Sequence, residues 1–287
     1  MPPTSAGPAA PNWIYCEPEN FYSLTNMVKL ATASGEAILT GLLDTCYLLL
    51  DTSPRAMCSR FTLNLGDAIN LSKKLGIPID EAMAGGKDRY NIAPSTDVVT
   101  FRHQEAASLR WGLIPHWSKA GSASSAPLIN ARGETIAEKP SFRTAWKKGQ
   151  RCLIPATGFF EWEKQGKERL PWLFQRNDGG PLAFAGLWDR WIDPIDDTVI
   201  ESVTVITTTP NPMLGRIHNR MPVLLDETTA SEWLDPDLAD PTAMITQFPA
   251  ERLKETPLDT YVNSSRVEGP ACLTPRGEAP GSQFDLF

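Results

Sequence analysis

From residue 57 onward, short runs of β-branched and aromatic residues are bounded by Gly, Pro, Asn or Asp. Runs of this kind are typical of strands joined by turns. The pattern therefore predicts a β-rich domain. The expected strand segments are "VVTFR" (98–102), "SLRWGLI" (108–114), "RCLIPATGFFEWEK" (151–164), "PWLFQR" (171–176), "LAFAGLW" (182–188), "SVTVITT" (202–208) and "MPVLL" (221–225).

Helical patterns are fewer. We expect helices in "DAINLSKKLG" (67–76), in "ETIAEKPSFRTAWKKG" (134–149), which ends in basic residues and glycine, and in "DETTASEWL" (226–234). Many strands with scattered helices predict an α+β fold, built on a largely antiparallel, barrel-like β-sheet with a few peripheral helices.

Residues 1–56 differ from this pattern. They open with the Pro/Ala/Ser-rich "MPPTSAGPAAP" and have no clean helical or strand period. We therefore interpret them as a non-native or removable extension, residues 57–270 as one catalytic domain, and residues 271–287 as a flexible tail. The most apolar early stretch, 37–52, is too short to cross a bilayer and carries Asp44.

Composition narrows the function classes. The chain has five cysteines, none in a C-x-x-C pair, and three histidines. Neither a disulfide framework nor a zinc site is suggested, and nothing indicates a cofactor or metal. With no basic segment leading into an apolar core near Met1, we expect a cytoplasmic monomer without a membrane partner, nucleoid-associated if bacterial.

Charge is unevenly distributed. The net charge of −7 argues against a uniformly basic nucleic-acid binder. Residues 102–151, however, carry nine Lys/Arg against three acidic residues, whereas residues 222–287 carry four against twelve. Taken alone, this contrast fits two solvated faces; it also fits a local basic face that holds a few phosphates.

Polar side chains that could support chemistry gather in four stretches: "MCSR" (57–60), "LINARGETI" (128–136), "GFFEWEK" (158–164) and "IHNRMP" (217–222). As an internal residue, Cys58 would be an ordinary small core thiol. As an N-terminal residue it would offer an α-amine beside a thiol, and the pair could condense with an aldehyde into a five-membered thiazolidine. No internal cysteine can do this, because its nitrogen is part of an amide.

Each of the other stretches allows a functional and a structural interpretation. Glu161, among aromatic residues, suits general acid–base work, or it is a strand glutamate facing water. His218 is a proton-shuttle candidate, or a histidine bonded to backbone. Asn130 and Arg132 alternate, so they share one side of an extended segment, where an amide and a guanidinium could serve one site, or they form a surface turn.

Tryptophans near these stretches add a weaker indication. Trp111, Trp117 and Trp162 could stack on unpaired bases, although most tryptophans belong to the core.

Taken together, these motifs resemble the SRAP (SOS response-associated peptidase) family, whose members sense abasic sites in single-stranded DNA. The likeness runs from Met57 to about Pro270. It rests on nine motifs in order: "MCSRF", "RYNIAPS", "RWGLIPHW", "NARGETIAEKPSFR", "RCLIPATGFFEW", "AFAGLW", "TTTPN", "IHNRMPVLL" and "YVNSSR".

The resemblance implies a covalent thiazolidine crosslink between an N-terminal cysteine and a ring-opened abasic site, which protects the lesion. The implied catalytic residues are Cys58, Asn130, Glu161 and His218. The implied DNA contacts are Arg60, Arg132, Pro94, Trp111 and Trp162. The expected partner is single-stranded DNA that contains abasic sites, bound with little sequence preference.

Two features depart from the family pattern. Ser59 stands where glycine usually follows the cysteine, which is tolerated if φ there is negative. More importantly, residues precede Met57, and while they are attached Cys58 has no free amine. Translation from Met57 with methionine removal is the favoured explanation; a propeptide cut after Met57, or a chain without covalent activity, are the others.

Two other function classes remain open. A cysteine-type peptidase or autopeptidase, with hydrolase or lyase activity, would use Cys58 as nucleophile and His218 as base. A non-covalent single-stranded DNA binder would need the Arg and Trp residues but neither Glu161 nor His218.

Overall fold

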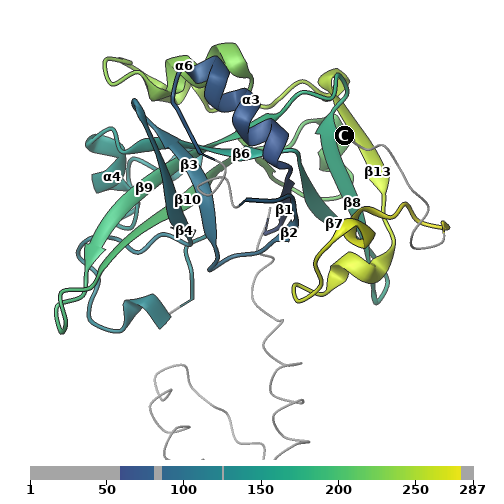
Figure 1. Cartoon of the computed structure of the whole chain (residues 1–287), viewed down its shortest axis with the longest axis horizontal. Helices are drawn as coiled ribbons and strands as arrows, with labels where there is room; N and C mark the ends of the chain where they lie inside the picture. The colour runs from purple at the N-terminus through teal and green to yellow at the C-terminus, as the bar shows by residue number, and fades with distance from the viewer. Residues whose placement is uncertain (1–58, 81–85, 125, 279–287) are drawn as a thin grey trace, which may run out of the picture. The chain divides into compact units, whose positions relative to one another are not determined.

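The computed structural model describes residues 59–80, 86–124 and 126–278 (Figure 1). The predictions made for residues 1–56 and for Cys58 lie outside these ranges. Within the ranges, no helix has both the length and the apolar character that a bilayer crossing requires.

Five strands close into a barrel. They are β3 (Asp97–Arg102), β4 (Glu105–Trp111), β6 (Arg151–Ala156), β9 (Leu182–Ile192) and β10 (Val199–Thr208). The neighbours run β10–β4–β3–β6–β9, and β9 pairs back onto β10. All of these pairings are antiparallel except β4 with β10, which is parallel. The predicted α+β, largely antiparallel and barrel-like fold is therefore confirmed.

Three short strands extend the barrel sheet. β5 (Asn130–Arg132) pairs parallel to β10, and β11 (Met221–Pro222) pairs antiparallel to the same strand. β12 (Leu224–Leu225) pairs with β9. The C-terminal half of β10 thus has the "NAR" segment on one side and the residues that follow "IHNR" on the other.

A second, antiparallel sheet has the order β13–β8–β7–β1–β2. Its strands are β1 (Phe61–Leu63), β2 (Arg89–Ile92), β7 (Gly158–Gln165), β8 (Glu168–Arg176) and β13 (Leu253–Pro257). The sequence predicted one continuous segment over 151–164, whereas the structure divides it at Thr157. The first part belongs to the barrel and the second to this sheet.

Thr157 is held at this division by three partners. Its hydroxyl donates to the Asp67 carboxylate at 2.6 Å and accepts from the backbone N–H of Asn64 at 2.8 Å, while its own N–H donates to the Thr62 carbonyl. One residue therefore ties the barrel to β1 and to the start of the first described helix.

The described helices are α3 (Leu65–Leu75), α4 (Arg143–Lys147), α5 (Pro212–Gly215) and α6 (Glu227–Leu234). α3 begins where the Asn64 side chain accepts the Asp67 N–H at 2.6 Å, and it ends at Gly76, whose φ of 66° suits glycine. α3 and α6 pack together on one end of the barrel (Figure 1).

The helix predicted over 134–149 is wrong in its extent. The structure has a 3₁₀ turn at Gly133–Thr135 and, after further turns, only the five-residue α4. Pro140 explains the break, because proline lacks an N–H and disfavours helical backbone in the residue before it.

The core joins the two sheets through aromatic rings. Phe61 on β1 packs edge-on against Trp111 of the barrel, with ring centroids 5.3 Å apart, and against Phe184, at 5.5 Å. Phe159 stacks on Phe174 at 5.3 Å. Removing one such buried ring typically costs about 3–5 kcal/mol.

Ordered packing continues beyond residue 270. A 3₁₀ turn covers Pro270–Leu273, the side chains of Cys272 and Leu273 are buried, and Leu258 forms a β-bridge with Pro275. Residues 271–275, which the sequence prediction placed in a flexible tail, are therefore packed against the outer face of the second sheet.

Candidate active site

The "NAR" segment is positioned by β10. In the parallel ladder Asn130 lies opposite Val205 and Arg132 lies opposite Thr207. Asn130 is half-buried with its amide oxygen out of contact with solvent, while Arg132 is exposed. The two residues alternate as predicted, so one strand presents an inner amide and an outer guanidinium.

His218 lies in the turn after α5. Asn211 caps that helix by accepting the Leu214 N–H at 3.0 Å, and the His218 N–H donates to the Leu214 carbonyl at 2.8 Å. The backbone N–H of Arg220 donates to Nδ1 of His218 at 3.2 Å. Since Nδ1 accepts, the neutral imidazole carries its proton on Nε2.

Arg220 connects the histidine turn to the "NAR" segment. Its guanidinium forms a two-pronged ion pair with Glu134, with Nη2 at 2.7 Å from Oε2 and Nη1 bonded to Oε1. Nη2 also donates to the Thr207 carbonyl at 2.7 Å. Hydrogen bonds from Arg220 hold the pKa of Glu134 below its usual value. Neither member of this pair was predicted from sequence.

Glu161 is buried, with 4% of its surface exposed. It lies in β7 opposite Trp172 of β8. The solvent-facing interpretation of this glutamate is therefore wrong, whereas Glu163, two residues along, is half-buried and accepts the indole N–H of Trp172 at 3.1 Å. The strand places one carboxylate inside and the next at the surface.

The turn that carries His218 also reaches the strand opposite Glu161. Arg216 lies over the Trp172 ring, 5.2 Å from its centroid, and forms an ion pair with Glu255 on β13. Arg220, at the other end of the turn, bonds to the barrel. Residues 216–220, which we call the bridging turn, therefore contact both sheets and link the strands that neighbour Glu161 and Arg132.

The side chain of Arg60 makes contacts within the protein. It donates to Asn91 Oδ1 at 3.0 Å and to the carbonyls of Val262 at 3.1 Å and Asn263 at 2.8 Å, and its guanidinium lies 4.9 Å from the centre of the Trp162 ring. Burial, with a smaller contribution from nearby Arg169, lowers the pKa of Arg60 to about 10.

Cys58 lies outside the described residues, but the residue bonded to it does not. Ser59 and Arg60 precede β1, where Phe61 pairs with Phe159 of β7, and the Phe160 N–H donates to the Arg60 carbonyl at 3.0 Å. The chain that leads to Cys58 therefore runs along the strand that holds Glu161.

The tryptophans differ in exposure. Trp111 is 1% exposed, and its indole N–H donates to the Ile129 carbonyl at 3.1 Å. It has no ring face open for stacking on DNA, because both the barrel and Phe61 cover it; the prediction for Trp111 is corrected accordingly. Trp117, six residues later, is 55% exposed.

Trp162 and Pro94 lie nearer the surface. Trp162 is half-buried, donates to Asn263 Oδ1 at 2.7 Å, and has Arg169 5.8 Å from its ring centre in addition to Arg60. Pro94 is half-buried in the turn before β3, next to Ser95, whose φ is 68°.

Comparison with known proteins bears directly on this arrangement. A model of the family described as SOS response associated peptidase (SRAP) matches residues 57–265. The chain belongs to the SRAP family.

Relatives with this SRAP domain include the abasic site processing protein YoqW of Bacillus subtilis, which is 34% identical over 76% of this chain and 99% of its own length. The abasic site processing protein HMCES of Gallus gallus is 33% identical over 58% of this chain and 56% of its own. A crystal structure from Bacteroides thetaiotaomicron matches with a TM-score of 0.69 at 26% identity, covering 76% and 99% of the two chains.

The cysteines that the structure describes within and beside the SRAP domain, Cys152 and Cys272, are poor nucleophiles. Both are buried, and burial raises the pKa of Cys152 well above its usual value and that of Cys272 to about 11. Among the described residues no three His, Cys, Asp or Glu side chains are grouped as a metal site would require.

Proposed function

We propose that this chain senses abasic sites in single-stranded DNA and links to them covalently through Cys58, once Cys58 is the N-terminal residue. The observation that carries the proposal is the burial of Glu161 beside the strand that leads to Cys58. Two further supports are the bridging turn, which carries His218 and contacts β8, the strand beside β7, and the abasic site processing names of the relatives.

The chemistry needs an amine, a thiol and managed protons. The Cys58 amine adds to the aldehyde of the ring-opened site and loses water to form an imine. The thiolate then attacks the imine carbon, the nitrogen takes up a proton, and a thiazolidine results. Glu161 accepts and returns the protons in these steps, because its carboxylate is held away from bulk water.

Asn130 and His218 have separate roles in this proposal. The Asn130 amide orients the Cys58 amine. His218 carries its proton on Nε2, so it donates to the sugar oxygen when the ring opens, and protonates the leaving group when the link reverses. Neither role requires a metal or cofactor.

DNA binding is assigned to the exposed groups. Arg132 would hold a phosphate, and Pro94 and the edge of Trp162 would contact the strand nearby. Trp117 replaces Trp111 as the stacking residue, because its ring is exposed. Since the Arg60 guanidinium is hydrogen-bonded internally, its proposed role at the DNA backbone is secondary to bracing the start of β1.

The state of the Cys58 nitrogen decides the activity. A chain started at Met57, with its methionine removed, should leave an abasic-site oligonucleotide attached after denaturation, and an intact oligonucleotide unattached. The 287-residue chain should attach neither unless it is first cut after Met57, which intact mass would reveal. Equal recovery of both oligonucleotides as free DNA with the Met57-started chain would overturn the covalent proposal.

The family description favours one second candidate, a cysteine peptidase. Its general base would be His218, yet Nε2 of the neutral ring is protonated and Nδ1 accepts from Arg220, so the imidazole is arranged as a proton donor. Acetylating the N-terminal amine distinguishes the candidates. It should abolish DNA attachment and leave a thiol peptidase active.

A further inference from the structure

A hollow on the barrel lies beyond the proposed active site, where β4 and β10 run parallel and β9 flanks β10. It is lined by Asp97, Ser108, Arg110, Arg190, Val199, Ile200 and Glu201. A second hollow, under Trp117, also includes Arg110 in its wall. The two hollows share Arg110 in their walls, and we call them together the Arg110 groove.

Two cations of the Arg110 groove stand out by their lack of partners. Arg110 is half-buried and Arg190 is exposed, and neither guanidinium makes a hydrogen bond or ion pair with any residue in the described ranges. Arg102, on neighbouring β3, differs. It bonds to Glu201 at 2.5 Å and lies 3.9 Å from the centre of the Trp188 ring.

An acid lies opposite each of these arginines, Glu201 across from Arg190 and Asp97 across from Arg110, but neither acid forms an ion pair with its neighbour. Glu201 is engaged by Arg102. Asp97 faces Arg110 across the β3–β4 ladder without forming an ion pair with it, and Asp97 also lies near Arg89, which donates to its carbonyl at 2.7 Å. The two free guanidiniums therefore remain available to an external anion.

One wall of the Arg110 groove leads along the chain into the "NAR" segment. The wall under Trp117 includes Pro127 and Leu128, and Leu128 comes two residues before Asn130 in the chain. Gly112 also lies in this wall, with φ of 128°, where a side chain would collide with Pro127; the glycine keeps the groove wall close to the "NAR" segment. A strand held at Asn130 and Arg132 can therefore run past Trp117 towards Arg110.

We propose that the Arg110 groove binds the phosphates of the single strand that flanks the lesion, with Arg110 and Arg190 as the phosphate contacts. The inference rests on the proposed function, since that function brings a single strand to Asn130. An exposed aromatic beside unpaired arginines is the arrangement that holds a single strand without reading its sequence. The site adds length-dependent affinity and leaves the chemistry at Cys58 unchanged.

The length of the bound DNA strand provides a test of the groove proposal. The full 287-residue chain is titrated with intact oligothymidylates of about 6 and about 20 nucleotides, over a range of salt concentrations. The double variant Arg110→Ala/Arg190→Ala should lose roughly tenfold affinity for the long strand at low salt, and its salt slope should fall by about 1.4. Affinity for the short strand should change less than twofold.

A matched variant controls for net charge. Lys73→Ala/Lys148→Ala removes two exposed cations that lie outside the groove, and it should bind the long strand like the parent. Arg110→Lys/Arg190→Lys should restore most of the affinity, because a phosphate contact needs the charge. Thermal unfolding checks that each variant is folded.

The outcomes separate the two proposals. If the parent chain binds both strands but the double alanine variant binds the long strand equally well, the groove proposal is overturned and the proposed function stands. If the parent binds neither strand, the groove proposal fails, and the proposed function is then decided by the crosslinking test on the Met57-started chain.

Discussion

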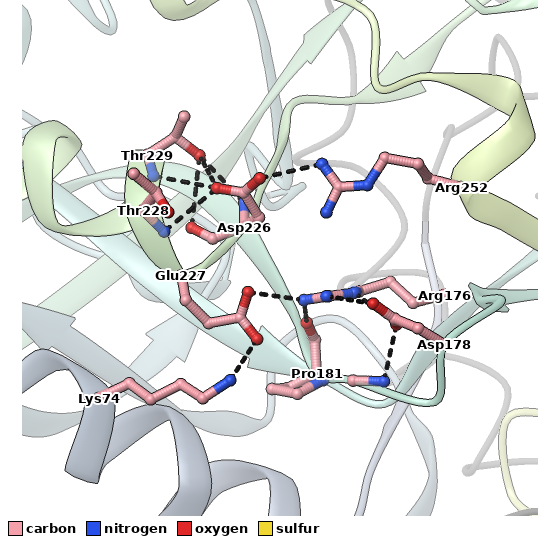
Figure 2. Close-up of polar contacts among 10 residues, drawn as sticks. Lys74, Arg176, Asp178, Pro181, Asp226, Glu227, Thr228, Thr229 and Arg252 are labelled. Carbon is pink, nitrogen blue, oxygen red and sulfur yellow. Dashed lines mark hydrogen bonds and ion pairs between the residues drawn. The ribbon is translucent and has the colours of Figure 1, made fainter.

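Two charged regions of this protein are built in opposite ways. At the α3–α6 end, Arg176 is 6% exposed and bonds to both carboxylate oxygens of Asp178, to Glu227 at 3.0 Å and to the Pro181 carbonyl (Figure 2). Lys74 adds a second cation to Glu227 at 2.5 Å. Each of these charges faces an opposite charge of the same chain.

The region around the bridging turn is organised differently. There the paired charges, Arg220 with Glu134 and Arg216 with Glu255, hold the turn, while Arg132 is exposed and makes no ion pair with any described residue. The comparison shows that this protein uses closed ion-pair networks to fasten elements, and leaves Arg132 exposed and without an ion pair among the described residues. An exposed, unpaired arginine is therefore more informative about function than a buried, saturated one.

The largest expected effect is on the crosslinking rate and comes from a change at Glu161 that should leave folding intact. Glu161→Gln keeps the shape of a 4%-exposed side chain and removes its ability to exchange protons. Crosslinking by the Met57-started chain should slow by about 10²–10⁴-fold, as quenched time courses on denaturing gels would show. Glu163→Gln, on the half-buried neighbour, should react like the parent. Equal rates for the two variants would remove Glu161 from the mechanism.

The next-largest effect is expected on the stability that the ion pairs of Arg176 provide. Arg176→Met leaves Glu227 and Asp178 without their buried partner, so the free energy of unfolding should fall by about 3 kcal/mol in urea titrations. Crosslinking at 25 °C should be unchanged. A loss of crosslinking in the folded variant would show that the two regions are coupled, which the comparison does not expect.

Trp117 should matter for binding alone. Trp117→Ala removes a ring that is 55% exposed, so the binding free energy for single-stranded DNA should become less favourable by about 1–3 kcal/mol. The salt slope should stay the same, because stacking releases no counterions. Trp111→Ala provides the contrast: it should lower the unfolding free energy by about 3–5 kcal/mol. A DNA effect from Trp111 without loss of stability would restore the original assignment.

The smallest effect is pH-dependent. Asp226 caps α6 and bonds to Arg252 at 2.9 Å; although burial opposes them, these bonds lower its pKa to about 2 (Figure 2). A lowered folded-state pKa stabilises the fold above the unfolded value of about 3.9, and this stability is lost as pH falls towards 2.

Asp226→Asn tests this titration, because asparagine keeps the cap but loses the charge. The variant should be less stable by about 1 kcal/mol at pH 7, and its unfolding free energy should decline less steeply between pH 4 and pH 2. Parallel acid profiles for variant and parent would contradict the assignment to Asp226.

Alternation predicted most of the strands but could not predict the burial of Glu161. Phe159 and Phe160, on opposite faces of β7, are both fully buried, so this end of the strand is covered on both sides. Alternation distinguishes inside from outside only where one face meets water. The sequence therefore indicated Glu161 as a candidate through its aromatic neighbours and the family resemblance, but only the packed structure shows that its side chain is buried.

Contacts between residues far apart in the chain could not be predicted from the sequence either. Glu134 and Arg220 are 86 positions apart, and nothing local in either motif indicates that they bond. The parallel pairing of β4 with β10 likewise depends on how the barrel closes. The family resemblance assigned Trp111, and not Trp117, to DNA; exposure, which separates these two tryptophans, is a tertiary property.

The bridging turn also sets a length. Its two arginines reach fixed anchors in different sheets, the Trp172 ring at one end and the Thr207 carbonyl at the other. One extra residue would add up to about 3.5 Å of chain between them, so one anchor would be lost. The number of residues from Arg216 to Arg220 therefore fixes the position of the barrel relative to the second sheet. Insertions in this turn should be tolerated less well than substitutions at Asn219.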